Sequence, residues 1–468
     1  MKNNGRLFSL DLLRGLDMFL LTVIGPIFWS VHRLHPLPDW ATEQFRHPWG
    51  GFTLWDLIMP LFIFMCGAAV PYALSKRKEK GRPTCDYWGH VALRVLALWV
   101  CGLLVQGDLA KLDVNRLYPF SNTLQSIAVG YLVAAVVFAV RAPVVRILAP
   151  ILLAGIYGVL LHFLGDYTTT GNFAFVVEKK VLAAILPASS QIAQGIAALT
   201  DQVVPGTSKF HYTWWLTSLM FAAMTLCGAL CAEILRAKVL LPRRRALLLY
   251  LVGAILLGAG WALVSTVPPI KHIFTVSFSC QAMGWCAFLL ATLYVLTDIL
   301  QLRAGMWLFT LYGQCALTAY MASHFFRGAI QKTAEAVVQG VPHLLGADAP
   351  NLPPELSEHL QNIQGVVVAV TSALVLTFVL WIRRRLRVAA EAKRAAREAL
   401  EAEAAPAGKT LDSGNGAVAD RYRIPAPDPE DTPAPRMASK VRLQLHKKEA
   451  GAPAQAEAPT VELKPLQR

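Results

Sequence analysis

The chain has 468 residues, of which 55% are hydrophobic and only 16% are charged, and its formal net charge is +14 at pH 7. This length would suggest several soluble domains, but this composition indicates a multi-pass membrane protein instead. The basic residues lie in short clusters between apolar stretches, a pattern that indicates membrane orientation and argues against a nucleic-acid partner. The sequence therefore predicts an all-α fold with the lipid bilayer as its main partner.

About ten segments are long enough to cross a bilayer, which takes about 20 apolar residues of helix. They are residues 8–31, 52–75, 89–107, 121–140, 145–164, 213–235, 245–265, 275–299, 304–325 and 363–383. A further apolar stretch, 181–200, contains Pro187 and two serines. This composition favours a re-entrant or interfacial helix there.

Clusters of lysine and arginine follow the second, sixth and tenth segments, at Lys76–Arg82, Arg236–Arg245 and Arg383–Arg387. Basic loops stay on the cytoplasmic side of a membrane, so we expect both termini to be cytoplasmic. The longer and less basic loops 165–212 and 326–362 are then expected on the opposite side.

The chain changes character near its end, and we expect a transmembrane domain at 1–387 and a cytoplasmic tail at 388–468. The tail begins with a helix-forming stretch rich in Ala, Glu and Arg, Val388–Ala405. Beyond it, Pro, Ala, Gly and charged residues dominate, and such a segment cannot bury enough apolar surface to fold.

Several common site motifs are missing from the sequence. Seven of the eight cysteines fall inside apolar segments, where a thiol behaves as a small hydrophobic group, so neither a disulfide framework nor a metal site is expected. The chain has no phosphate-binding P-loop, no Gly-x-Ser-x-Gly elbow and no His-Glu-x-x-His. These absences argue against ATP-driven transport and zinc-dependent hydrolysis.

The stretch between the first two segments reads His47-Pro-Trp-Gly-Gly-Phe-Thr-Leu-Trp-Asp56. Ionisable groups where a helix enters a membrane are costly, and they point to a functional site. A two-glycine turn lets the backbone fold closely there. The alternative interpretation is an interfacial loop with a tryptophan anchor, Trp49, and a helix cap.

Three charged residues, Asp11, Arg14 and Asp17, interrupt the first apolar segment at intervals of three. That spacing places them along one side of a helix, which should face the protein interior. We interpret Arg14 as a contact for the phosphate of a donor. Asp11 and Asp17 are interpreted as members of an internal ion pair.

Polar groups also begin the fourth segment, at Asn122, Gln125 and Ser126. Side chains at a helix start can serve as caps alone. Gln125 and Ser126 lie deeper in the segment, so capping alone explains them less readily.

Two further groups are expected on the outer side of the membrane. Lys271 and His272 precede the eighth segment and could bind an anionic or sugar ligand, although a surface loop is the simpler interpretation. Tyr320, His324 and Arg327 share one helix face near the outer end of the ninth segment. A histidine in such a position is more often structural than catalytic.

Three N-terminal motifs resemble the heparan-alpha-glucosaminide N-acetyltransferase family of transmembrane acyltransferases. They are Arg6-Leu-Phe-Ser-Leu-Asp-Leu-Leu-Arg-Gly15, the stretch from His47 to Asp56, and Pro60-Leu-Phe-Ile-Phe-Met-Cys-Gly67. Weaker similarity continues through 122–131, 269–277 and 311–320, so the resemblance covers roughly residues 6–383.

The resemblance implies a bacterial inner-membrane enzyme that moves an acetyl group from cytoplasmic acetyl-CoA to a periplasmic amino sugar or glycan. His47 corresponds to the active-site histidine of that family, and Asp56 would orient it. We expect Arg14, Gln125 and Ser126 near the cofactor. Trp49, Lys271, His324 and Arg327 are expected near the acceptor.

The sequence also departs from the family pattern. The asparagine of the family turn is Gly50 here, and the asparagine of the first span has no counterpart around Ile24-Gly25-Pro26. These differences bear on the identity of the acceptor. A transporter of sugars or cell-wall fragments is the alternative function, and a homodimer is left open.

Overall fold

A computed structural model of the chain describes residues 7–79, 84–106, 118–140, 142–186, 190, 212–344 and 354–404. Within these residues the regular elements are all helical, which confirms the all-α prediction. The helices are α1 (Phe8–Phe19), η1 (Leu20–Ile24), α2 (Gly25–Leu34), α3 (Asp39–Gln44), η2 (Leu54–Leu57), α4 (Ile58–Glu79), α5 (Thr84–Gln106), α7 (Thr123–Ala139), α8 (Pro143–Leu164), α9 (Phe173–Ile185), α11 (Ser218–Arg236), α12 (Pro242–Ala262), α13 (Val276–Tyr294), η4 (Val295–Ile299), α14 (Trp307–Gln314), α15 (Ala316–Leu344) and α16 (Pro354–Ala404).

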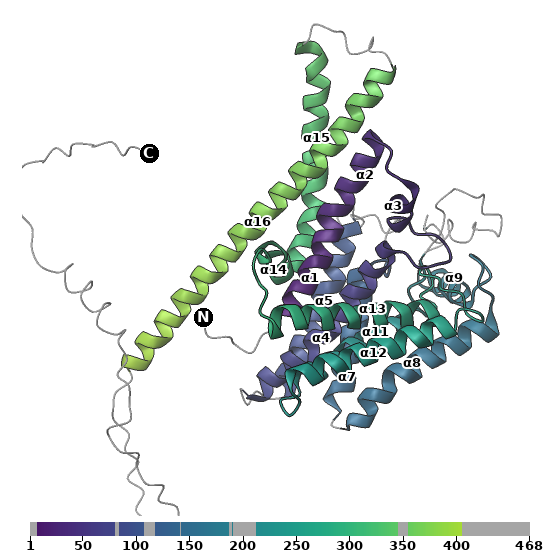
Figure 1. The fold of residues 1–468 in the computed structure, drawn as a ribbon, viewed down its shortest axis with the longest axis vertical. Helices are drawn as coiled ribbons and strands as arrows, with labels where there is room; N and C mark the ends of the chain where they lie inside the picture. Colours follow the sequence, from purple (N-terminus) through teal and green to yellow (C-terminus); the bar gives the residue numbers. More distant parts are fainter. Residues whose placement is uncertain are drawn as a thin grey trace, which may run out of the picture. The chain divides into compact units, whose positions relative to one another are not determined.

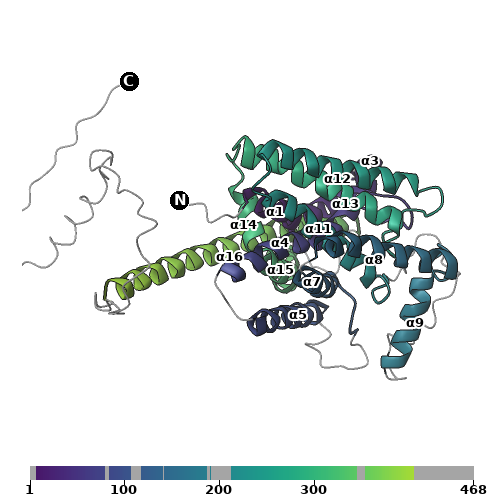
Figure 2. The ribbon, with the colours of Figure 1, turned by 90° about the horizontal axis from the view of Figure 1, so that it is seen from below.

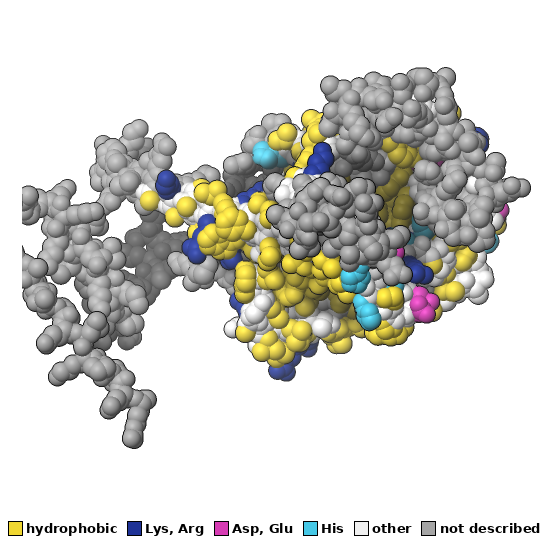
Figure 3. Space-filling view, turned by 90° about the horizontal axis from the view of Figure 1, so that it is seen from above, with side chains coloured by type: hydrophobic (Ala, Val, Ile, Leu, Met, Phe, Trp, Pro, Cys, Tyr) yellow, Lys and Arg dark blue, Asp and Glu magenta, His cyan; other side chains and the backbone are white. Residues whose placement is uncertain are grey.

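Among the described residues, eight helical stretches are long and apolar enough to cross a membrane. They are Phe8–Leu34, Leu54–Ala73, Tyr87–Val105, Pro143–Leu164, Ser218–Arg236, Pro242–Ala262, Val276–Ile299 and Gln361–Lys393. Large hydrophobic side chains are exposed along several of them, and yellow hydrophobic atoms cover much of the described surface seen in Figure 3. An exposed apolar surface of this kind is suited to lipid, so the chain is a multi-pass membrane protein.

Two of the ten predicted segments differ from this set. The fourth, 121–140, is the apolar helix α7, which has only 17 residues. The ninth, 304–325, is broken, because α14 ends at Gln314 and α15 starts at Ala316. Cys315 between them has φ −120° and ψ 25°, which is outside the helical range.

The predicted outer loop 326–362 is also wrong in part, since helix fills most of it. α15 continues to Leu344 and α16 begins at Pro354. The predicted re-entrant helix at 181–200 overlaps the end of α9, and most of the rest of it lies outside the described residues.

The chain divides into a compact unit, Met1–Arg397, and a second unit, Glu398–Arg468. Within the first unit, α12 lies along α13, α11 packs against α4, α7 and α8, and α1 packs against α14 (Figures 1 and 2). Helix α16 continues without a break to Ala404. The segment predicted to be disordered beyond it lies outside the described residues.

Glycines let the central helices approach at backbone distance. A Cβ atom on Gly67 of α4 would lie 1.7 Å from the carbonyl oxygen of Thr225 on α11, and one on Gly228 of α11 would lie 1.9 Å from that of Phe64. Small residues at such crossings replace the hydrophobic driving force that is missing between helices in lipid. The α4–α11 contact therefore fixes the helix that begins with the His47 stretch.

The first span is not a regular α-helix throughout. The π-helical segment η1 separates α1 from α2, and Pro26, which has no backbone N–H, is the second residue after it. Gly25 faces the ring of Trp55 so closely that a Cβ would lie 2.2 Å from the ring. The interruption thus makes room for an aromatic side chain from the start of the second span.

Candidate functional site

A short capped helix presents Asp56 to the site. Thr53 precedes η2 and forms a capping box with Asp56. The backbone N–H of Thr53 donates to Asp56 Oδ2 over 3.1 Å, and the Thr53 hydroxyl donates to the carbonyl of Arg46 over 3.0 Å. One carboxylate oxygen is thus committed to the helix start, which leaves Oδ1 aimed at other partners.

The glycine turn ties this helix start to a distant loop. Gly51 has φ +111°, a conformation that side chains with a Cβ rarely adopt. Its backbone N–H donates to the carbonyl of Pro269 over 2.8 Å. Pro269 belongs to the connection between α12 and α13, and this bond brings that connection against the His47 stretch.

Three ionisable side chains meet at Asp56 Oδ1. His47 Nδ1 lies 2.6 Å from this oxygen, and Lys271 Nζ lies 3.3 Å from it. Lys271 Nζ also lies 3.1 Å from His47 Nδ1 and 3.5 Å from His47 Nε2. The structure therefore brings together both residues predicted to be catalytic and one predicted to contact the acceptor.

The three groups differ in their access to solvent. Asp56 is 0% exposed and Lys271 is 4% exposed, whereas the side chain of His47 is 34% exposed. The imidazole is therefore accessible from outside the protein, while the carboxylate and the amine lie behind it. Because an ionised carboxylate only accepts hydrogen bonds, Nδ1 is the donor in the 2.6 Å contact, and Nε2 is the ring nitrogen that this contact leaves free of Asp56.

The loop that carries Lys271 is held by several hydrogen bonds. The Thr275 hydroxyl accepts from the N–H of Ile270 over 2.9 Å and donates to the carbonyl of Pro268 over 2.8 Å. Tyr157 from α8 donates to the carbonyl of Ile273. Burial lowers the pKa of Lys271 to about 8, although the nearby charge of Asp56 and its hydrogen bond oppose this effect.

An aromatic stack forms one wall of the site. The ring of His272 lies between Trp49, with centroids 5.3 Å apart, and Tyr212, with centroids 4.7 Å apart. Trp49 Nε1 donates to the carbonyl of Tyr167 over 3.0 Å. Burial lowers the pKa of His272 to about 4, and the neighbouring His47 and Lys271 act in the same direction. His272 is therefore neutral at pH 7.

A buried carboxylate, Glu178 of α9, fixes the segment that carries Tyr212. It accepts hydrogen bonds from the Tyr118 hydroxyl over 2.7 Å and from the backbone N–H groups of Trp214 and Trp215 over 2.9 and 3.0 Å. Burial raises the pKa of Glu178, and these three donors oppose that rise. These hydrogen bonds therefore hold in place the segment that contributes Tyr212 to the aromatic stack.

The residues predicted to contact the cofactor are not part of this cluster. Gln125 accepts from the N–H of Ser121 over 2.7 Å and donates to the carbonyl of Pro119 over 2.9 Å. Ser126 donates to the carbonyl of Asn122 over 3.2 Å. The capping interpretation accounts for these bonds, and a contact with the cofactor stays a prediction.

Arg14 lies on α1 and reaches towards α4. Its Nη2 donates to the carbonyl of Met65 over 3.4 Å, and its Nη1 lies 3.9 Å from Asp11 Oδ1. The pairing predicted for Asp11 is therefore present. The pairing predicted for Asp17 is wrong, because both of its carboxyl oxygens are buried with no hydrogen-bond partner in the described part of the chain.

Two residues on α15, His324 and Arg327, were predicted to contact the acceptor. Neither has a described contact with the His47 cluster. His324 Nδ1 lies 2.9 Å from the carbonyl of Tyr320, and the two rings are 4.6 Å apart. The side chain of Arg327 lies outside the described residues. A role for either residue stays a prediction.

Sequence reasoning did not single out Tyr212, Glu178 or Arg94. Tyr212 and Glu178 lie in a long loop and a short helix, where no local pattern marks them. Arg94 did leave a signal, since it is a single arginine inside the apolar segment 89–107. Its guanidinium lies 4.4 Å from the centroid of the Tyr131 ring.

The N-terminal part of the chain, residues 6–103, matches the family described as Domain of unknown function (DUF5009). The matched region includes the first span, the His47–Asp56 stretch and α4. No curated protein matches the chain.

Proposed function

We propose that this membrane protein is an acyltransferase that moves an acetyl group from cytoplasmic acetyl-CoA to an amino sugar or glycan in the periplasm of a bacterium, across the inner membrane. The observation that carries the proposal is the contact of His47, Asp56 and Lys271 at one carboxylate oxygen. A partly exposed imidazole held by a buried carboxylate is an arrangement suited to general-base catalysis.

In this proposal His47 acts as the base. Its Nε2 removes a proton from the amine of the acceptor while nitrogen attacks the thioester carbonyl of the donor. The new nitrogen–carbon bond forms as the carbon–sulfur bond breaks, and coenzyme A leaves as a thiol that takes the proton from the imidazole. Asp56 keeps the imidazole in the required tautomer and stabilises its positive charge during the transfer.

Lys271 contributes a positive charge beside the reacting atoms. Its ammonium lies within 3.5 Å of both ring nitrogens of His47. Negative charge develops on the thioester oxygen as the amine attacks, and a buried cation stabilises such charge more strongly than water does. An acetyl-histidine intermediate is the competing route, and it would use the same three residues.

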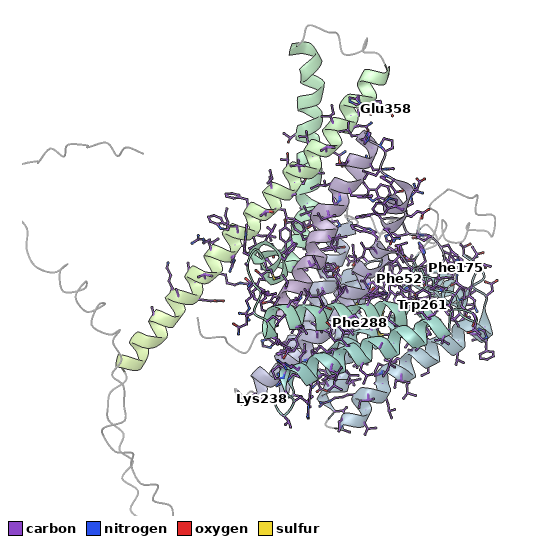
Figure 4. The ribbon with its side chains drawn as sticks, in the orientation of Figure 1. Phe52, Phe175, Lys238, Trp261, Phe288 and Glu358 are labelled. Carbon is purple, nitrogen blue, oxygen red and sulfur yellow. The ribbon has the colours of Figure 1, made fainter. Side chains whose placement is uncertain are left out.

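The arrangement of α12 supports a site on the outer side of the membrane. The basic cluster at Arg243–Arg245 starts this helix, and Lys271 follows its other end. Figure 4 shows Lys238 and Trp261 near opposite ends of α12. Because basic loops remain cytoplasmic, the His47 cluster belongs to the opposite face.

Two arginines mark a route for the donor. Arg14 and Arg94 both lie near enough to Cys66 of α4 for their charges to act on its thiol. Guanidinium groups bind phosphate through paired hydrogen bonds, and the nucleotide end of acetyl-CoA carries phosphates. The resemblance of the N-terminal motifs to transmembrane N-acetyltransferases supports the same donor.

Acetyl transfer by the purified protein in detergent tests the proposal, with radiolabelled acetyl-CoA as donor and glucosamine as acceptor. We expect transfer by the wild type and a loss of at least about a hundredfold in His47→Ala, because general bases contribute about 10²–10⁴-fold. His35→Ala is the matched control, since His35 is an exposed histidine after α2.

Each failure has a separate meaning. Transfer that survives in His47→Ala would refute the role of His47. Binding of acetyl-CoA without transfer to glucosamine would refute this acceptor. A protein that does not bind acetyl-CoA would refute the enzyme, and uptake of labelled sugar into proteoliposomes would then support the transporter.

A further inference from the structure

Asp17 is a second ionisable group in the membrane interior, and it takes no part in the proposed transfer. It lies on α1, ten residues into the span Phe8–Leu34, which places it about 14 Å from the start of the helix at 1.5 Å per residue. It is 0% exposed. Its two carboxyl oxygens have no hydrogen-bond partner in the described part of the chain.

The direction of Asp17 follows from its position on the helix. It is rotated about 120° from Asp11 but aligned within about 40° with Leu10 and Leu13, at 100° per residue. Both leucines belong to the main hydrophobic core. The carboxyl group therefore faces packed apolar side chains, whereas the backbone carbonyl of Asp11 packs against Gly313 of α14.

The neighbouring charges on α1 and α4 are directed elsewhere. Arg14 is three residues from Asp17, but its guanidinium contacts the carbonyl of Met65 and the carboxylate of Asp11. Cys66 on α4 interacts with Arg14 and Arg94. Among the described side chains of these two helices, no positive charge therefore compensates an ionised Asp17.

The other helices around α1 supply no counter-charge in their described residues. Asp298 of η4 accepts hydrogen bonds from the first N–H groups of α1, and Tyr312 of α14 is 2.8 Å from the hydroxyl of Thr377. On α15, His324 contacts Tyr320 of the same helix. Cys286 of α13 lies near enough to feel the charge of an ionised Asp17, and its thiol is buried and uncharged.

We infer that Asp17 is a proton-binding site within the membrane, occupied by a proton at neutral pH and separate from the His47 cluster. An ionised carboxylate that is buried without a partner is so costly that the group takes up a proton instead. The ligand is a proton rather than a metal ion, because metal cations of biological importance take several oxygen ligands and the surroundings of Asp17 are apolar.

Proton release from Asp17 is linked to movement of α1. Deprotonation requires water or a cation to reach the carboxylate, so α1 must separate from the core side chains that cover it. On the α14 side the backbones interlock, since a Cβ on Gly15 would lie 1.6 Å from the carbonyl oxygen of Phe309. The π-helical segment η1, three residues beyond Asp17, is a place where the helix can change its register, as π-helical turns frequently are at functional sites.

Infrared difference spectroscopy of wild type against Asp17→Asn tests the proton directly. At pH 7 we expect the wild type to show the carbonyl stretch of a protonated carboxylic acid, and the variant to lack it. Carboxylate stretching bands in the same difference spectrum would overturn the inference. If the variant does not fold, wild-type protein with ¹³C-labelled aspartate side chains takes its place, and the absence of an isotope-shifted acid band at pH 7 would overturn the inference.

Thermal unfolding at several pH values provides an independent measurement. A carboxyl that is neutral when folded and ionised when unfolded destabilises the folded state as the pH rises above 4. The ratio of folded to unfolded wild type should then decrease relative to Asp17→Asn, by up to about tenfold per pH unit. Asp11→Asn is the matched control, since Asp11 is paired with Arg14. Equal pH dependence of the wild type and Asp17→Asn would refute a neutral Asp17, whatever the protein does with acetyl-CoA.

Discussion

Replacing Asp56 by asparagine is the most informative perturbation of the His47 cluster. The substitution keeps the size of the side chain and the cap acceptor for Thr53, but it removes the negative charge. Lys271 then has an ammonium that is 4% exposed and has lost a carboxylate 3.3 Å away. The variant therefore isolates the electrostatic part of the site from its packing.

The expected loss of stability follows from the burial of both partners. Removing one member of a buried ion pair costs about 3–5 kcal/mol, because the other charge remains buried without compensation. The cost should be largest below pH 8, where Lys271 is charged, since its pKa is lowered to about 8. Above that pH the amine is increasingly neutral, and the penalty should shrink.

A double-mutant cycle with Lys271→Met measures this coupling by thermal unfolding in detergent. We expect Asp56→Asn/Lys271→Met to be more stable than the sum of the single changes predicts, by about 1–3 kcal/mol. Asp39→Asn is the control, because Asp39 is an exposed aspartate in the first turn of α3. Additive effects of the two substitutions would refute a direct Asp56–Lys271 interaction.

Three further predictions concern the charge at Lys271 and the close approach of the backbone at glycines. Acetyl transfer should decline as the pH rises through about 8, because the ammonium of Lys271 loses its proton there. Lys271→Arg should remove this decline, because a guanidinium stays charged. A pH–rate profile of both proteins tests the prediction. Gly51→Ala should lower the free energy of unfolding by about 1–3 kcal/mol through its positive φ, while Gly50→Ala, with open space around it and no positive φ, should change it by less than about 0.5 kcal/mol; thermal unfolding shows the difference. Gly67→Ala should prevent α4 and α11 from packing and reduce the yield of folded protein. Gly89→Ala in α5, where nothing lies within 4 Å of the added Cβ, should be neutral or stabilising by about 1 kcal/mol. Size-exclusion profiles compare the two variants, and equal profiles would refute the packing argument.

The sequence alone was sufficient for the class of fold and for two members of the site. Long apolar segments reveal membrane helices because lipid cannot satisfy backbone polar groups. His47 and Asp56 lie nine residues apart in one motif, so a local reading could pair them. Lys271 lies 224 residues from His47, and only the packing of the α12–α13 connection brings it there. The sequence marks Lys271 as a charged residue near a membrane segment, but it does not reveal which residues lie next to it in the fold.

Hydropathy was least informative where helices break or extend beyond the membrane. The interruption at Cys315 carries no proline, and the single glycine two residues before it, Gly313, is too weak a signal to mark a break within the apolar segment 304–325. The extension of α15 to Leu344 involves polar residues that a hydropathy pattern assigns to a loop. The arrangement of Asp17 was missed for another reason: its spacing from Arg14 fits an ion pair, but Arg14 is drawn to the carbonyl of Met65.

The two interpretations of the His47 stretch, a helix cap and a catalytic motif, are compatible because Asp56 has two oxygens. Oδ2 accepts the N–H of Thr53 and closes the capping box, while Oδ1 meets His47 and Lys271. The cap fixes the torsions of the aspartate side chain, so the direction of Oδ1 is set before any substrate binds. Preorganised groups of this kind avoid the cost of reorientation during a reaction. A structural role for Asp56 is therefore the means by which it can position His47, and it does not argue against a functional one.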